Sequence, residues 1–170
     1  GRPARRTPVR HPVRRVRRFT LTPRSLAFTV AAAAVVVDQA TKWVAVRTLA
    51  DGPVSLIGEF LQFRLVKNPG SSFSLFQGSG AIIALIAIAA VAIIVVIARD
   101  LPGKAEGVAI GLVLGGAVGN LLDRVFRGDG WLDGKVIDFV DFNFFPTFNV
   151  ADSAITIGAI LAVILAFRER

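Results

Sequence analysis

The chain has 170 residues, of which 54% are hydrophobic, and its mean hydropathy is +0.63. Such a composition fits one membrane domain better than a soluble domain of the same length. The net charge is +8, but nine of the twenty basic residues are arginines that precede Ser25, with no acid among them. Because the aromatic and glycine pattern of RNA- and DNA-binding modules is missing, we do not expect nucleic acid as a partner.

Cysteine is absent, and the single histidine, His11, lies in the arginine-rich segment. A lone histidine without a second ligand is expected to be a solvated residue rather than a metal ligand or a general base. These absences exclude thiol nucleophiles, disulfides, Ser–His triads and HExxH zinc sites. Any catalysis must therefore use carboxylates, hydroxyls, amides, lysine or arginine, and we expect neither a metal nor a cofactor.

Residues 1–24 form a basic, proline-containing arm that we expect to be disordered and cytoplasmic. The apolar run after it is longer than a signal peptide, contains charges and lacks a clear cleavage site, so we interpret it as a retained span. With three later apolar runs, it predicts one membrane domain over residues 25–170 with four transmembrane helices. The expected spans cover residues 25–50, 78–98, 107–122 and about 149–167.

The arginines of the arm also predict the orientation of these spans. Basic segments stay in the cytoplasm, so four crossings return the C-terminus to that side, and the connections 51–77 and 124–148 face outward. Residues 60–66 are rich in strand-forming residues and partly alternate, which predicts a small sheet. We therefore expect an all-α membrane protein with both termini in the cytoplasm and a small extracytoplasmic β-sheet and loop region.

Charged side chains within apolar spans are costly, so each of them is a candidate for function. Asp38 and Lys42, in the sequence DQATK, are four residues apart and share one helix face. Either they neutralise each other within one helix, or they orient a substrate and neighbouring groups. Asp123 and Arg124, at the end of GGAVGNLLDR, are interpreted as a second ionised pair, and the glycines before them would allow close helix packing.

Two further stretches place polar residues where the chain enters a span. Asn68 and Gly70 belong to NPGSSFS, which is also typical of a turn followed by a helix cap. Asp138 lies in the aromatic-rich VIDFVDF, and Asp152 opens the last span, where an acid complements the helix dipole. Two carboxylates at the same depth in apolar surroundings would share a proton and titrate as a unit. One would take a proton from water while the other polarises a peptide carbonyl.

Five motifs in this order, DQATK, NPGSSFS, GGAVGNLLDR, VIDFVDF and FNVADS, resemble those of the lipoprotein signal peptidase (signal peptidase II) family over residues 26–167. The resemblance implies an aspartic endopeptidase of the cell (inner) membrane that removes the signal peptide from diacylglyceryl-modified prolipoproteins, just before the lipidated cysteine. It implies Asp138 and Asp152 as the catalytic pair, at the extracytoplasmic face, with Asp123 as the competing candidate. The residues implied to line or brace the site are Asp38, Lys42, Asn68, Gly70, Asn120, Asp123, Arg124, Asn149 and Ala151.

The expected partners are lipid-modified prolipoproteins and membrane lipids, and we expect a monomer. Two other functions remain open. One is a serine–lysine hydrolase, and the other is a small transporter or assembly scaffold that uses Asp38, Lys42 and Asp123 as a polar path. Because the second span is wholly apolar, the sequence favours a surface-facing site over such a path. The candidate pairs of the hydrolase are Ser72 or Ser74 with Lys42 or Lys67.

Overall fold

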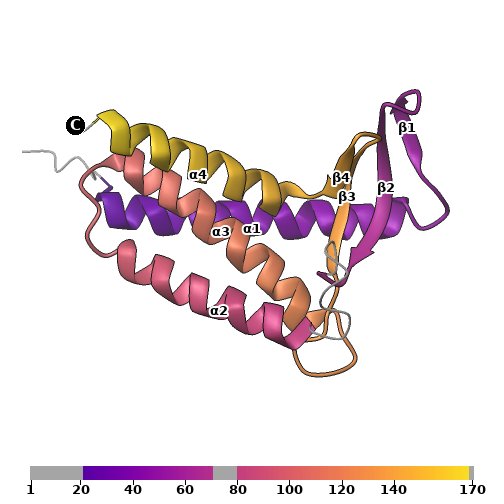
Figure 1. The fold of residues 1–170 in the computed structure, drawn as a ribbon, viewed down its shortest axis with the longest axis horizontal. Coiled ribbons are helices and arrows are strands. Elements are labelled where there is room, and N and C mark those ends of the chain that lie inside the picture. The colour runs from indigo at the N-terminus through magenta and orange to yellow at the C-terminus, as the bar shows by residue number, and fades with distance from the viewer. Residues whose placement is uncertain (1–20, 71–79, 169–170) are drawn as a thin grey trace, which may run out of the picture.

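A computed structural model describes residues 21–70 and 80–168. Within these ranges the chain forms four helices and four strands, and the sheet lies at one end of the helices, where the first helix ends (Figure 1). The predicted arm lies outside the described residues up to residue 20, and so do the serines at positions 71, 72 and 74. The helices are α1 Pro23–Thr48, α2 Gly80–Ile97, α3 Lys104–Phe126 and α4 Val150–Arg168.

Among the described helices, α1, α3 and α4 are long and apolar enough to cross a membrane. Helix α2 is also apolar, but it is shorter than the other candidate spans. Helix α1 begins where the hydroxyl of Thr22 accepts a hydrogen bond from the Ser25 N–H at 3.1 Å, with Pro23 in the first turn. Three of the four predicted spans therefore have the length and composition of a membrane crossing, and the crossing by α2 stays a prediction.

Helix α3 packs against the three other helices, and its glycines allow the close approach. A β-carbon at Gly115 would lie 2.7 Å from the carbonyl oxygen of Ala31 in α1, and one at Gly116 would overlap the carbonyl oxygen of Ala151 in α4. Neither gap can hold a side chain, so glycine is required on both faces of α3. The predicted packing role of the GGAVG glycines is confirmed.

The strands are β1 Val54–Ile57, β2 Leu61–Asn68, β3 Val136–Phe142 and β4 Phe145–Phe148, and they form one antiparallel sheet in the order β1-β2-β3-β4. The strand predicted at 60–66 is confirmed as β2, whereas β3 and β4 were not predicted as strands. Val66 lies opposite Asp138, and Lys67 lies opposite Ile137. Because side chains alternate along a strand, Asn68 shares the face of Asp138, and Lys67 shares the opposite face with Ile137.

An apolar cluster holds the sheet against the end of α1. Ala45 of α1 and Leu49, which directly follows α1, are buried against Phe139 of β3, and Phe63 of β2 packs on the same cluster. The rings of Phe63 and Phe139 meet edge to face, with their centroids 6.3 Å apart. This contact fixes β3 over the helix ends and thereby sets the position of Asp138.

Candidate active site

The two carboxylates of Asp138 and Asp152 come from β3 and from the first turn of α4. Asn149, directly before α4, connects them. Its side-chain oxygen accepts from the Asp152 N–H at 2.9 Å, and its own N–H donates to Oδ2 of Asp152 at 3.1 Å, which is a reciprocal helix cap. The Nδ2 of the same residue donates to Oδ1 of Asp138 at 2.7 Å. One capping residue thus holds both acids.

Asp138 is 2% exposed and accepts a second hydrogen bond, at its Oδ2, from Nδ2 of Asn68 at 2.9 Å. Burial raises the pKa of Asp138 to about 6, from an ordinary value of 3.8. The charge of Asp152 raises this pKa further, while the hydrogen bonds from the two asparagines oppose the rise. A carboxyl group with such a pKa exchanges its proton close to neutral pH.

Asn120 of α3 links Asp152 to a buried lysine. Its Oδ1 accepts from Nζ of Lys42 at 2.9 Å and from Nδ2 of Asn149 at 3.1 Å. Two donors on the oxygen side leave only one orientation for the amide, so the Nδ2 group faces Asp152 and donates to its Oδ1 at 2.8 Å. The orientation of this amide is therefore set by the lysine.

Lys42 and Asp38 are fully buried, and their predicted pairing is confirmed at 2.9 Å. The ammonium of Lys42 also lies 2.8 Å from Oδ2 of Asp123, so with Asn120 it has three acceptors for its three N–H groups. Asp38 accepts at Oδ1 from the Ala151 N–H at 3.0 Å. The pair is thus not confined to α1, because it ties α1 to α3 and α4.

The predicted pairing of Asp123 with Arg124 is wrong. Asp123 instead binds Lys42 and Nε of Arg127, the latter at 2.7 Å. Neighbouring residues on a helix point about 100° apart, whereas residues four apart share a face. Arg124 therefore turns toward Gly70, where an added β-carbon would lie 3.2 Å from its Nη2.

Arg124 has an unusual environment for a buried guanidinium. It is 9% exposed, and its buried Nη1 has no hydrogen-bond partner among the described residues. The carboxylates of Asp138 and Asp152 are close enough to the Arg124 guanidinium for their charges to attract it. Because a buried donor without an acceptor is costly, the Nη1 group, which has no partner in the described part of the chain, is available to bind a ligand.

Comparison with known proteins identifies the family. The sequence model of signal peptidase II matches residues 30–168, which include every residue of the site described above. The chain belongs to the signal peptidase II family. Lipoprotein signal peptidases from Rhodococcus jostii and Streptomyces griseus are 46% and 42% identical to it, over 84% and 82% of this chain and 72% and 71% of theirs.

Two solved structures of a bacterial membrane enzyme share the fold of this signal peptidase II family member. Both are 31% identical to it, with TM-scores of 0.72 and 0.73. The first covers 84% of this chain and 88% of its own, and the second covers 85% and 94%. The protein is therefore a protease of a membrane-enzyme family.

The structure brings the predicted site residues together: polar contacts run without a break from Asp138 to Lys42, and Arg124 lies beside Gly70 outside this chain of contacts. Gln39 and Arg127 belong to this network but were not predicted as site residues. Gln39 donates from Nε2 to Oδ2 of Asp38 at 3.1 Å and to Oδ1 of Asp123 at 3.2 Å. Its place within DQATK, and the spacing of Arg127 four residues after Asp123, were the available signals. For the serine–lysine alternative, the serines lie outside the described residues, and Lys42 is already bound by two carboxylates.

Proposed function

We propose that this chain is an aspartic endopeptidase that removes the signal peptide from diacylglyceryl-modified prolipoproteins, cutting just before the lipidated cysteine. The observation that carries the proposal is the joint binding of Asp138 and Asp152 by Asn149. The relatives named lipoprotein signal peptidases support the substrate class. All the groups that the reaction needs come from one chain, so a monomer suffices.

The two acids have different roles in this proposal. Asp152 lies at the N-terminus of α4 and accepts from Asn120 and from the N–H of Asn149, and both features stabilise a negative charge. It takes the proton from the attacking water. Asp138, whose pKa is raised, holds a proton and donates it to the scissile carbonyl oxygen. The new bond joins the water oxygen to the carbonyl carbon. The C–N bond then breaks as the amine nitrogen takes the proton from Asp152, and the hydroxyl of the tetrahedral intermediate returns its proton to Asp138 as the new carbonyl forms.

Arg124 is proposed to contact the substrate backbone. Its unpartnered Nη1 needs an acceptor, and a peptide carbonyl in the site supplies one. Gly70 leaves room for this contact because a side chain there would meet both the guanidinium and Ile83. Asn68 holds Asp138 in place from β2. Asp38, Lys42 and Asp123 act as a brace for Asn120, which supports a positioning role for Asp123 rather than proton transfer.

We infer that the protein lies in the cell (inner) membrane with four crossings, including α2, and with the sheet and the two acids at the extracytoplasmic face. The three membrane-length helices and the arginine-rich arm support this arrangement. The expected partners are its lipid-modified prolipoproteins and the surrounding lipids.

The test is cleavage of a diacylglyceryl-modified prolipoprotein by the purified protein. We expect Asp138→Asn and Asp152→Asn each to lower kcat by roughly 10²–10⁴-fold, the usual contribution of general acid–base groups. Asp123→Asn should retain partial activity. Asp100→Asn, an exposed acid beyond the end of α2, is the control and should be fully active. Full activity of either Asp138→Asn or Asp152→Asn would refute the proposed pair.

A further inference from the structure

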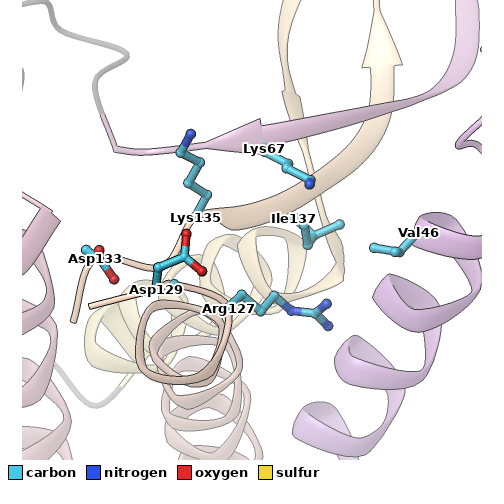
Figure 2. A pocket seen from close by; sticks show the side chains of 8 residues that line it. Val46, Lys67, Arg127, Asp129, Asp133, Lys135 and Ile137 are labelled. Atoms are coloured by element: carbon cyan, nitrogen blue, oxygen red, sulfur yellow. The ribbon is translucent and has the colours of Figure 1, made fainter. Parts of the chain in front are cut away.

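A second polar pocket lies on the opposite face of β2 and β3 from Asp138. We call it the sheet pocket, and its volume is about 330 Å³. Val46 of α1 and Ile137 of β3 form its apolar wall, and Lys67, Arg127 and Lys135 are its cationic residues (Figure 2). The pocket therefore lies where the sheet meets the ends of α1 and α3, and it shares no lining residue with the proposed catalytic pair.

Strand geometry explains why two lysines line this pocket. Lys67 lies directly opposite Ile137, and Lys135 precedes Ile137 by two residues, so the alternation of a strand places all three on one face. Both lysines are exposed, and neither forms an ion pair with a carboxylate of the described part of the chain. Their charges are thus available to a ligand.

Arg127 adds a third cation, of which only part is engaged. Its Nε is bound to Asp123 at 2.7 Å, and the N–H groups of its Nη atoms are additional donors. In Figure 2 the ammonium of Lys67 and the guanidinium of Arg127 lie on either side of Ile137, toward α1. The acids of the pocket, Asp129 and Asp133, lie on the side of the pocket that is farther from α1. An anion is therefore favoured at the end of the pocket nearest α1.

The depth of the sheet pocket indicates which anion is available. Val46 is two residues before the end of α1, and Arg127 directly follows α3, so the pocket lies at the level where these two membrane-length helices end. Phe126, directly before Arg127, and Trp131, between Asp129 and Asp133 in the sequence, are 75% and 73% exposed. Exposed tryptophans such as Trp131 are enriched at the headgroup level of a bilayer, where the abundant anion is the lipid phosphate.

We propose that the sheet pocket binds the phosphate headgroup of a membrane phospholipid. The phosphate lies between Lys67 and Arg127, with Lys135 at the entrance, and Phe126 and Trp131 contact the upper part of the acyl chains. This site goes beyond the proposed peptidase activity and does not depend on it. Its effect would be to attach the sheet to the membrane surface on the side away from the two acids.

The test is a titration of the purified full chain, in an uncharged detergent, with short-chain phosphatidylglycerol. The double variant Lys67→Gln/Lys135→Gln should bind about twenty- to thirtyfold more weakly, because each basic residue near a membrane surface contributes about fivefold. The control, Arg99→Gln/Lys104→Gln, removes the same charge at the other end of the helices and should bind normally. Diacylglycerol, which lacks the phosphate, should not compete.

Unchanged affinity in the double variant, or an equal loss in the control, would overturn the proposal, since the second result indicates diffuse electrostatic attraction. The cleavage rate of the double variant is measured in the same detergent and should remain normal, which shows that the variant is folded. A raised KM for prolipoprotein together with unchanged phospholipid affinity would assign the pocket to the substrate and would also overturn it.

Discussion

Asp138 and Asp152 are both carboxylates, yet their surroundings differ enough to separate their roles. Asp138 is buried in a strand, and its pKa is raised to about 6. It is therefore protonated below about pH 6 and loses the proton as the pH rises through that value. If this proton polarises the scissile carbonyl, kcat/KM falls about tenfold per pH unit on the alkaline side. A pH–rate profile in detergent checks this expectation.

Replacing Asn68 tests whether the alkaline limb of the pH–rate profile reports the pKa of Asp138. Asn68 donates to Asp138 and opposes the rise of its pKa, so Asn68→Ala should move the alkaline limb to higher pH. Lys104→Gln, far from the site, should leave the limb in place. Activity that increases as the pH passes through 6 would contradict the assignment and would exchange the roles of the two acids.

Lys42 is the cation that neutralises the buried carboxylates of Asp38 and Asp123. Lys42→Met leaves the carboxylates of Asp38 and Asp123 without their shared cation, so we expect a loss of about 3–5 kcal/mol in the free energy of unfolding. Combining it with Asp38→Asn should cost less than the sum of the two single changes, because the pair is coupled. Denaturant unfolding in detergent measures the four proteins of this cycle.

The exposed pair of Arg64 and Asp141 is the matched control for the buried pair. Its atoms approach to a similar 2.9 Å, but the Arg64 side chain is 52% exposed. Solvent screening limits such a pair to roughly 0–1 kcal/mol, so Arg64→Met should have little effect on unfolding. Equal losses for Lys42→Met and Arg64→Met would show that burial does not set the strength of the Lys42 contacts.

At the level of elements, α3 depends on glycine for its place between α1 and α4. A β-carbon at Gly115 would lie 2.6 Å from Cβ of Ala34, which backbone relaxation cannot absorb without separating the helices. Gly115→Leu should therefore lower stability by more than about 3 kcal/mol and abolish cleavage, because α3 also carries Asn120. Ala33→Leu, on an exposed face of α1, adds the same side chain and should be tolerated. Unfolding in detergent distinguishes the two.

The elements differ in how well the sequence predicts them. Uninterrupted apolar runs predict the helices, because a span in lipid has few alternatives. Strand β3 was missed because Val136 to Phe139 are buried on both faces, so apolar and polar residues do not alternate as they do in a half-buried strand. Residues opposite one another in β2 and β3 then decide which polar groups meet. No local pattern specifies that register.

The same limit applies to the site. The motifs predicted the residues that meet at the sheet end of the bundle, but the contact of Asp123 with Lys42 depends on the facing sides of two helices at once. Sequence adjacency predicts Arg124 as the partner of Asp123, whereas the observed contact with Arg127 follows the helical spacing. The spacing rule was already sufficient for Asp38 and Lys42. Applied to Asp123, it would have predicted Arg127.

At the level of the whole molecule, the sheet lies at one end of the helices, and the connection between α2 and α3 lies at the other (Figure 1). The arginine-rich arm precedes α1, and α1 starts at the same end of the helices as the α2–α3 connection. If basic segments stay in the cytoplasm, the sheet end is the outer end. The same assumption predicts that α2, the shortest of the four described helices, crosses the membrane, because its connection to α3 lies at the inner end.

Cysteine labelling tests this orientation with little background, because the chain has no cysteine. Glu59→Cys lies in the turn between β1 and β2, and Asp100→Cys follows α2; both positions are exposed. A membrane-impermeant maleimide should label Glu59→Cys in intact cells and Asp100→Cys only after the membrane is opened. Labelling of both in intact cells would mean that α2 does not cross, and labelling of Asp100→Cys alone would place the two acids in the cytoplasm. Because prolipoproteins would be processed at the outer face, that last result would contradict the proposed reaction as well as the topology.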